Sequence, residues 1–287
     1  MRQRVYSVLI DGKELIEINP SGVQARIQFE VTVDALGSIT LCDMTLSNLK
    51  KETTNYAFRR GAILELIAGY EDNYGYIFKG AIRNVFKGRS GATTTIQVLA
   101  RGGVLEKGVV NVSLGENAKL SDILKDVVSA AGFKLVFNEA DYADVYTTGY
   151  SITADPRIVL NQLSKAWRFK WAIENDSIII FRQSQPRRSP TKVINMKSGM
   201  EGIPEVTEIG INFSVRLDPS IRIGSLVTLD TEYKSFNFSG VYYPTGLQDV
   251  QGTGEYTAAK IVFSGDNYGL NWNTKVEGWL QNAEEIN

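Results

Sequence analysis

The sequence predicts a mainly β protein with an α/β insert, in which two barrel-like β modules flank a small α/β domain. Three observations support this fold class. Alternating apolar and polar residues, typical of half-buried strands, fill residues 1–103 and return from 192 to about 280. One of these strand patterns occurs twice. Between the two regions, apolar residues recur at helical spacing instead.

The repeated pattern reads RGAILELIAGYEDNYGYIFKGAI at 60–82 and RIGSLVTLDTEYKSFNFSGVYY at 222–243. Four glycines hold corresponding places in the two copies, Gly61 with Gly224 and Gly80 with Gly240. Each copy ends in one more alternating strand, at 93–102 and at 256–265. Glycine marks sharp bends or close backbone approach in small barrels. We therefore expect the two regions to share one β fold.

The first β module is expected over 1–103. Its strands are predicted from alternation and from β-branched and aromatic residues, at 5–10, 26–33, 38–46, 62–70, 76–86 and 93–100. The polar segment 48–61 interrupts this run and is expected to hold a short helix or a loop. The apolar stretch that begins at Val5 stops at Asp11, too short for the ~7–15 residues of a signal-peptide core.

The α/β insert is expected over 104–185. Leu120, Ile123, Leu124, Val127 and Val128 predict a helix that ends before Gly132, and a strand follows at 133–137. Asp155 and Pro156 are an N-cap and a first helical position, and this helix continues to Trp167. Residues 169–174 and 177–183 then predict a hairpin. We expect Leu124, Val128, Leu163 and Trp167 to pack on a sheet that contains Ile173, Ile178 and Ile180.

The segment SQPRRSPT at 184–191 is predicted to be a linker, because its two prolines and its polar residues pack and pair poorly. The pair Arg187-Arg188 is interpreted as part of this solvated linker rather than as an anion site. The second β module is expected over 186–280, and 281–287 is expected to be a polar C-terminal tail.

Composition excludes several function classes. The net charge of −1 gives no electrostatic footprint for nucleic acid or for an acidic membrane surface. The chain has no histidine, which removes His-based zinc sites and nucleophile systems that need imidazole. No apolar run approaches the roughly 18 residues of a membrane span. The single cysteine, Cys42, lies in an alternating run and is expected to be a small buried side chain.

Catalytic motifs are weak. Glu139, Asp141 and Asp144 lie close together in sequence, and paired carboxylates serve glycoside hydrolysis, but these acids fall in a polar connection where solvated acids are normal. The turn 71–73 lacks the calcium-loop spacing, and Ser90 does not match a nucleophile elbow. Three N-x-S triplets, at Asn111, Asn212 and Asn237, matter only in a eukaryotic secretory route. We predict no catalytic, cofactor-binding or metal-binding residue and no cofactor.

Aromatic residues are abundant, with 13 Tyr, 12 Phe and four Trp. Trp272 and Trp279 lie near the C-terminal end. Exposed aromatic residues there would suit a contact with another subunit, but core packing is the favoured interpretation.

Several stretches together resemble a known family. These are TLSNLKKET at 45–53, RGAILELIAGY at 60–70, IFKGAI at 77–82, the segment 200–229 with LDPSIRIG, and VFSGDNYGLNWNTKVEGW at 262–279. The chain resembles phage tail baseplate hub proteins, the group that includes the central hub of contractile tails. It is also similar to the hub part of type VI secretion spike proteins.

The resemblance implies a virion structural protein that is not an enzyme, with two tail-tube-like barrels. It implies a homotrimer with pseudo-six-fold symmetry that joins a hexameric tail tube or tube initiator to a separate trimeric spike. Tape-measure protein and surrounding baseplate proteins are the other implied partners. DNA would pass through the lumen without specific binding, no membrane insertion is expected, and assembly would occur in the bacterial host cytoplasm before the protein enters the tail baseplate. A contractile injection system is the favoured setting.

Two other functions stay open at this point. One is a carboxylate-based cell-wall hydrolase of a tail tip that uses Glu139, Asp141 and Asp144. The other is a ring-forming module of a secretion channel, because strand–helix–strand units like the insert occur there, although fold alone does not give function.

Overall fold

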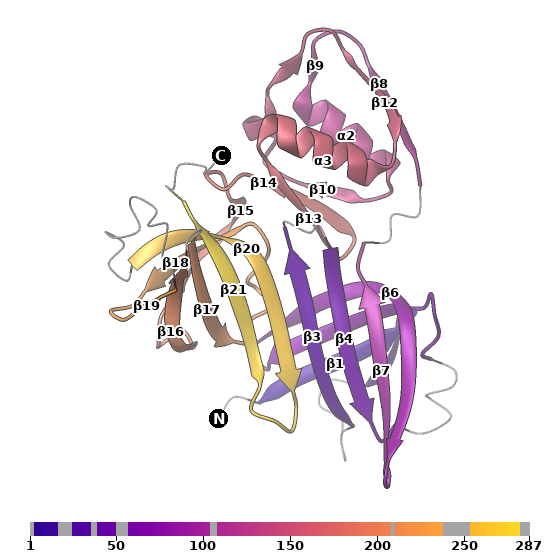
Figure 1. Cartoon of the computed structure of the whole chain (residues 1–287), viewed down its shortest axis with the longest axis vertical. Helices are drawn as coiled ribbons and strands as arrows, with labels where there is room; N and C mark the ends of the chain where they lie inside the picture. The colour runs from indigo at the N-terminus through magenta and orange to yellow at the C-terminus, as the bar shows by residue number, and fades with distance from the viewer. Residues whose placement is uncertain are drawn as a thin grey trace.

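The structure, a computed structural model, describes residues 3–16, 25–35, 39–49, 57–103, 108–207, 210–237 and 253–281. The chain is mainly β, as the sequence predicts. Two β regions lie side by side and the α/β insert stands at one end of them (Figure 1). None of the helices described is long and apolar enough to cross a bilayer.

The described part of the first β region contains seven strands. They are β1 (Arg4–Ile10), β2 (Lys13–Ile16), β3 (Arg26–Asp34), β4 (Ile39–Ser47), β5 (Ile63–Tyr70), β6 (Asn73–Ser90) and β7 (Thr93–Arg101). All six predicted strands of this region are present. Half of the segment predicted as a short helix or loop, residues 50–56, lies outside the described residues, and its described half contains no helix.

The second β region also contains seven described strands. They are β15 (Arg187–Ile194), β16 (Met200–Thr207), β17 (Gly210–Arg216), β18 (Ser225–Asp230), β19 (Ser235–Phe236), β20 (Thr253–Asp266) and β21 (Trp272–Leu280). All fourteen strands belong to one sheet. The two regions join where β20 pairs antiparallel with β3, from Lys260 opposite Asp34 to Asp266 opposite Gln28.

The two β regions have the same strand order. The sheet runs β1-β5-β6-β7-β4-β3 in the first region and β15-β18-β20-β21-β17-β16 in the second, so corresponding strands follow in the same chain order. A β-bulge interrupts β6 between Ile82 and Asn84, and another interrupts β20 at the corresponding place after Ala258. Gly61 and Gly224 both have positive φ, and each donates its N–H at 2.8 Å, to the carbonyls of Ile82 and Ala258. The predicted match of these two glycines is confirmed.

Other parts of the predicted correspondence are wrong. Residues 256–265 lie in β20, which takes the place of β6, whereas the predicted counterpart 93–102 is in β7. Gly80 of β6 therefore corresponds to a position in β20 rather than to Gly240, which lies outside the described residues. The outermost pairs also differ, because β1 runs antiparallel to β5 while β15 runs parallel to β18. Whether each region closes into a barrel stays a prediction.

The linker predicted at 184–191 is also wrong for most of its length. Arg187 begins strand β15, which pairs with β18 at Arg187 and again from Lys192 to Ile194, with a register shift between Arg187 and Lys192. Proline is tolerated in a strand at such an irregular edge position, where its missing N–H breaks no ladder bond. Arg187 itself is not solvated linker, because it forms an ion pair with Glu174 at 2.7 Å.

The insert contains the helices and the hairpin that the sequence predicts. Its elements are β8 (Val110–Leu114), β9 (Ala118–Lys119), α2 (Leu120–Ala130), β10 (Lys134–Val136), a 3₁₀ turn η1 (Glu139–Tyr142), β11 (Val145–Tyr146), β12 (Tyr150–Ala154), α3 (Pro156–Trp167), β13 (Lys170–Glu174) and β14 (Ser177–Phe181). The Asp155 side chain accepts the backbone N–H of Arg157 at 2.8 Å, as an N-cap does. The short strands β8, β9, β11 and β12 were not predicted.

The insert has a core of its own and also a shared one. Leu124, Val128 and Leu163 pack with Ile173, Ile178 and Ile180 as predicted, but Trp167 is only partly buried. The opposite face of β13 and β14 packs on both β regions in a second cluster formed by Val33, Ala35, Ala172, Ile179, Phe181, Ile223, Ala259 and Trp279. The insert is therefore anchored to the sheet by side chains as well as by the chain. The domain boundaries stay a prediction.

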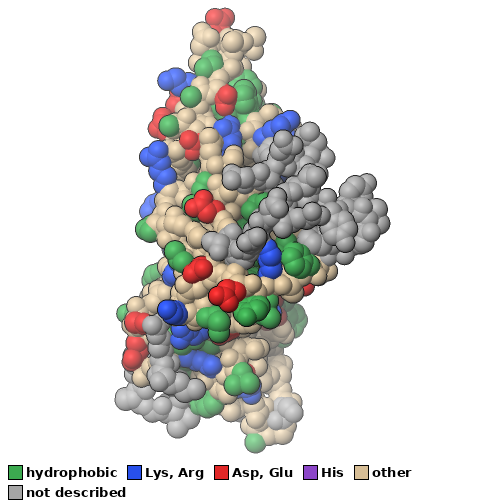
Figure 2. Space-filling model, turned by 90° about the vertical axis from the view of Figure 1, so that its left-hand side faces the viewer, with side chains coloured by type: hydrophobic (Ala, Val, Ile, Leu, Met, Phe, Trp, Pro, Cys, Tyr) green, Lys and Arg blue, Asp and Glu red, His purple; other side chains and the backbone are tan. Residues whose placement is uncertain are grey.

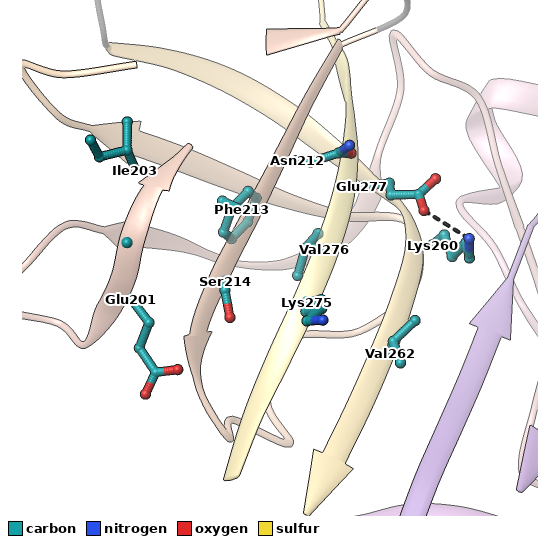
Figure 3. Close-up of a pocket in the computed structure, with 11 residues that line it drawn as sticks. Glu201, Ile203, Asn212, Phe213, Ser214, Lys260, Val262, Lys275, Val276 and Glu277 are labelled. Carbon is teal, nitrogen blue, oxygen red and sulfur yellow. Dashed lines mark hydrogen bonds and ion pairs between the residues drawn. The ribbon is translucent and has the colours of Figure 1, made fainter. Parts of the chain in front are cut away.

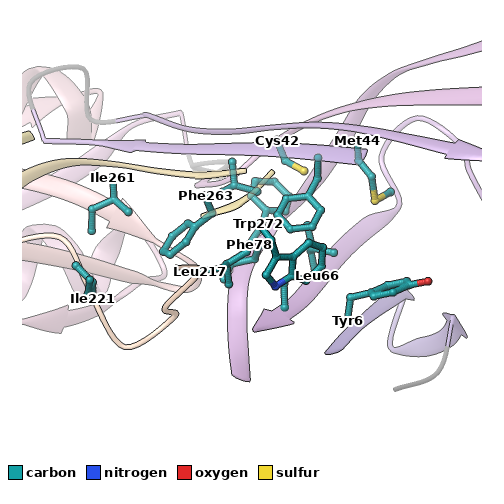
Figure 4. Close-up of a cluster of buried hydrophobic side chains, with 14 of the residues drawn as sticks. Tyr6, Cys42, Met44, Leu66, Phe78, Leu217, Ile221, Ile261, Phe263 and Trp272 are labelled. Carbon is teal, nitrogen blue, oxygen red and sulfur yellow. The ribbon is translucent and has the colours of Figure 1, made fainter. Parts of the chain in front are cut away.

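One large hydrophobic cluster spans the two β regions. Trp272 of β21 lies 2% exposed between Tyr6 and Phe29 of the first region, and its Nε1 donates to the Gly69 carbonyl at 3.0 Å (Figure 4). Cys42 is buried in the same cluster, as predicted, and burial raises the pKa of its thiol. The core interpretation of Trp272 and Trp279 is confirmed. The shared core fixes the two regions against each other.

Candidate assembly surfaces

The three acids weighed for hydrolysis do not form a site. The Glu139 carboxylate pairs with Lys125 at 2.6 Å, and Asp144 pairs with Arg182 at 3.4 Å. Asp141 accepts from the Asn138 side chain at 2.7 Å. Each acid has a different partner around η1, and none of them lines either of the two principal hollows of the described surface. The three acids are close in sequence, but they do not line a shared hollow that could hold a sugar and a water molecule.

Other sequence candidates have structural roles. Residues 71–73 form the turn from β5 to β6, and the Asn73 side chain donates to Asp218 at 2.8 Å. Asn111 lies in β8 and bonds to Thr153, while Asn212 lies in β17. Within the described part of the chain, no group of three or more acidic or cysteine side chains is placed to hold a metal ion.

The polar face of the continuous sheet is the broadest surface that both β regions share. It is hollowed twice. A hollow of about 320 Å³ lies over β16, β17, β21 and β20, where Gly202 and Ile203 bulge away from β17 (Figure 3). Val262 gives it an apolar side chain, whereas the side chains of Phe213 and Val276, which also border it, are buried in the core. Lys260 and Glu277, paired at 2.7 Å, lie at one side of it.

A second hollow of about 500 Å³ lies over the junction of the two regions. Polar side chains from β3, β4, β7, β20 and β21 line it, among them Glu30, Asp43, Gln97, Asp266 and Asn273. Lys275 borders both hollows. The pKa of Asp266 is lowered by the hydrogen bond from Arg26, and that of Lys260 is raised by Glu277, so both stay charged at neutral pH. These two shifts favour a contact surface over acid–base chemistry.

The turn between β20 and β21 presents two exposed apolar side chains on a fixed backbone. We call residues 267–271 the hairpin tip. Leu270 is 96% exposed and Tyr268 is 63% exposed. Arg4 donates to the carbonyls of Asp266 and Gly269 at 2.9 and 2.7 Å, which ties the tip to the first β region.

Asn267 also anchors the hairpin tip to the first β region. The Asn267 side chain accepts the Ile27 backbone N–H at 3.0 Å and donates to the Tyr6 hydroxyl at 2.8 Å. Exposed apolar residues held rigid in advance lose little conformational entropy on binding. The hairpin tip is therefore well suited to contact another protein.

The segment LDPSIRIG joins all three parts of the molecule. Asp218 accepts hydrogen bonds from Asn73 of the first β region and from Lys192 and Ser220 of the second. Arg222 donates to the Tyr76 carbonyl at 2.9 Å and to Glu174 of the insert at 3.3 Å.

The glycine at the end of this segment, Gly224, packs closely against the insert. A Cβ on Gly224 would lie 2.7 Å from the Phe181 ring of the insert, so only glycine fits there. The segment that contributed to the family resemblance is thus a three-way junction.

Charges on the side of the molecule near the second β region are mixed. Basic, acidic and hydrophobic side chains alternate over the part that is described, without one dominant charged patch (Figure 2). This distribution agrees with the net charge of −1 and favours protein contacts over a polyanion track.

The comparison with family models decides the assignment. The model described as "Baseplate hub gp41" matches residues 9–237. The chain belongs to this baseplate hub family. The match runs through the first β region, the insert and most of the strands of the second region, so the hub assignment rests on more than one local motif.

Solved structures share the fold of this hub chain. A 43 kDa tail protein of prophage MuSo2 from Shewanella oneidensis has a TM-score of 0.60 at 12% identity, with 98% of each chain covered. A tail protein from Neisseria meningitidis MC58 has a TM-score of 0.59 at 10% identity, with 98% of this chain and 99% of that chain covered.

A third neighbour comes from a secretion system. The E. coli c3393 protein, a type VI secretion component, has a TM-score of 0.50 at 8% identity, with 95% and 76% of the two chains covered. No curated protein matches the hub chain in sequence.

Sequence reasoning missed the surfaces that now stand out on the hub. The hairpin tip lies inside the stretch SGDNYGLNW, which entered only as part of the resemblance. A signal was present, because Asp266, Asn267 and Gly269 predict a turn, and the apolar residues in it, Tyr268 and Leu270, then have no strand face to join. The hollow at Ile203 depends on the bulge in β16, which Gly202 and Pro204 mark in the sequence.

Proposed function

We propose that the chain is the baseplate hub subunit that forms a homotrimeric ring with pseudo-six-fold symmetry, between a hexameric tail tube and a separate trimeric spike. The observation that carries this proposal is the matching strand order of the two β regions, including the glycines at 61 and 224. Three copies with two similar regions each present six similar wall segments. A hexameric tube can meet such a ring on one face while a trimer meets the other.

The surfaces described above have roles in this ring. The polar sheet face spans both regions and is suited to line the passage for DNA or tape-measure protein, because it carries charges of both signs and would bind neither tightly. The hairpin tip supplies apolar anchors for a neighbouring protein. The chain acts mechanically, without catalysis, in the tail baseplate, after assembly in the host cytoplasm.

Native mass spectrometry of the purified chain, alone and coexpressed with a trimeric spike protein from the same phage, tests the ring. We expect three hub copies for each spike trimer, and a free chain that is trimeric or becomes so with the spike. A stable dimer, or six hub copies in the assembled particle, would contradict the proposal.

A matched pair of variants tests the hairpin tip. Leu270→Ser together with Tyr268→Ser should leave circular dichroism and thermal unfolding of the chain unchanged, because both side chains are exposed. The same double variant should abolish incorporation into particles when it replaces the wild-type hub in infected cells. Exposed Met196→Ser, in the connection between β15 and β16, is the control and should support assembly.

Zymography on peptidoglycan tests the absence of catalysis. The wild-type chain and the triple variant Glu139→Gln, Asp141→Asn, Asp144→Asn should show equal background lysis. If the wild type lyses peptidoglycan and the triple variant does not, the result would contradict a purely mechanical function and support the hydrolase.

A further inference from the structure

Three arginines from separate elements meet where the first β region joins the insert. Arg101 ends β7 and stands opposite Leu41 of β4 and Ala81 of β6. Arg83 is the extra residue of the β6 bulge. Arg157 lies in the first turn of α3, whose N-terminus carries the positive end of the helix dipole.

These arginines lack anionic partners among the described residues. The Nε atoms of Arg101 and Arg157 are buried and have no hydrogen-bond partner. Arg157 uses Nη2 to donate to the Gly103 carbonyl at 3.2 Å. The nearest acid in sequence, Asp155, accepts the Arg157 backbone N–H as an N-cap. The cluster therefore contains guanidinium donors that the described part of the chain does not use.

Such a cluster is costly in the free protein. Burial lowers the pKa of Arg101, and the charges of Arg157 and Arg83 lower it further. The chain has 32 acidic residues, yet no described one forms an ion pair with this group. A partly buried cation without a counter-charge is destabilising. An arrangement that costs stability in the free protein is a common property of binding sites.

We propose that Arg83, Arg101 and Arg157 form a binding site for a carboxylate on an acidic segment of a partner protein. This site goes beyond the proposed ring, because it would bind its ligand whatever the number of subunits. Guanidinium groups fit carboxylates through two parallel hydrogen bonds, and no hydrogen bond to a described residue occupies the guanidinium of Arg83 or Arg101. Leu41, which is half exposed beside Arg101, offers an apolar contact next to the acid.

The surroundings favour a short acidic segment over nucleic acid. The same sheet face carries Glu30, Asp43 and Asp266 farther along. A DNA backbone that reached the arginines along this face would meet these carboxylates and be repelled. A single Asp or Glu side chain, or a short acidic stretch, can reach the cluster from the insert side without passing them.

Fluorescence anisotropy with the full chain tests the site. The probes are a labelled decapeptide of glutamate and, at matched charge, a short DNA duplex. We expect the wild type to bind the peptide at low salt, more tightly than the duplex. Arg101→Gln and Arg157→Gln should each weaken peptide binding about tenfold or more, and exposed Arg83→Gln should weaken it less. Arg188→Gln, an exposed arginine on β15, is the matched control and should bind as the wild type does.

Thermal unfolding of the same variants distinguishes arginines that bind a ligand from arginines that stabilise the fold. If the cluster awaits a partner, Arg101→Gln relieves repulsion and its Tm in the absence of peptide equals or exceeds that of the wild type. A fall in Tm with unchanged peptide binding would show that the arginine serves the fold, and would overturn the site. Tighter binding of the duplex, lost in the same variants, would overturn the carboxylate in favour of phosphate.

Discussion

Trp272 shows how one side chain holds the two β regions together. Its ring lies edge-on to Phe29, with the centroids 5.4 Å apart, and its Nε1 bonds to the Gly69 carbonyl across the boundary between the regions. Sequence reasoning could predict its burial from the alternation around it. It could not predict the partners, because Trp272 and Gly69 are about 200 residues apart in the chain.

Substitution of Trp272 by Phe keeps an aromatic ring but removes the Nε1 donor group that bonds to the Gly69 carbonyl. We expect the free energy of unfolding to fall by about 1–3 kcal/mol from this group alone, and Trp272→Ala to cost about 3–5 kcal/mol. Trp167→Phe is the control, because that residue is only partly buried, and it should cost clearly less. Urea unfolding measures all three. Equal losses for Trp272→Phe and Trp167→Phe would contradict the bridging role.

Asp218 makes stability depend on acid pH. Burial alone would raise the pKa of its carboxyl, but the hydrogen bonds from Lys192, Ser220 and Asn73 outweigh burial and lower it. A carboxyl with a lower pKa in the folded state stabilises the fold above its unfolded pKa of about 3.9, and this contribution is lost as pH falls through the folded pKa.

The variant Asp218→Asn should therefore unfold more easily than the wild type at pH 7, and the difference should shrink below about pH 4. Asp126→Asn, an exposed acid on α2, is the control and should follow the wild type throughout. Thermal unfolding between pH 2.5 and pH 7 measures the effect, because this range spans the reference pKa of an aspartate. A constant difference over this range would mean that Asp218 acts through packing and not through its charge.

Among the elements, β15 shows where sequence patterns mislead. The segment 184–191, in which β15 begins, has two prolines and two arginines and therefore the composition of a linker, and the irregular pairing of β15 with β18 gives no clean alternation. Its position is decided by tertiary contacts, above all the Glu174 carboxylate, which lies between Arg187 and Arg222 at 2.7 and 3.3 Å. The helices of the insert were predictable because caps and apolar spacing are local, whereas the two-residue strands depend on partners.

The change Glu174→Gln leaves both arginines without their counter-charge. Loss of one partner from a buried ion pair costs up to about 3–5 kcal/mol, and the side chain of Glu174 is only 10% exposed. We expect reduced hydrogen-exchange protection in β15 and in β13. Glu139→Gln, which breaks the exposed pair with Lys125, should have little effect. Unaltered protection in β15 would show that strand pairing alone holds this element.

At the scale of the whole molecule, the shared cluster between the insert and the sheet decides how many cooperative units the chain has. Leu124 lies in the private core of the insert, whereas Phe181 packs against Ile223 and Trp279. The predicted domains follow the chain, but the packing crosses their boundaries. Which surfaces meet partner proteins was not predictable from one sequence, because a solvated strand face and an assembly face carry the same alternation.

The variants Leu124→Ala and Phe181→Ala distinguish the two cores. Each should cost about 2–5 kcal/mol in the unit that contains it, since both side chains are at most 1% exposed. Hydrogen exchange should show loss of protection confined to the insert for Leu124→Ala, and spreading into β3 and β20 for Phe181→Ala. Equal spreading in both variants would mean that insert and sheet unfold as one unit.

The pairing of β3 with β20 also implies a delay during synthesis, because β3 is made long before its partner strand. Asp34 leaves the ribosome more than two hundred residues before its partner Lys260. At roughly 5–20 residues per second, the edge of β3 waits on the order of 10–50 s for its neighbour. An unpaired strand edge is prone to aggregation during that interval. Nascent chains halted before β20 should therefore be held by chaperones, and correct yield should depend on translation speed through the second half of the gene.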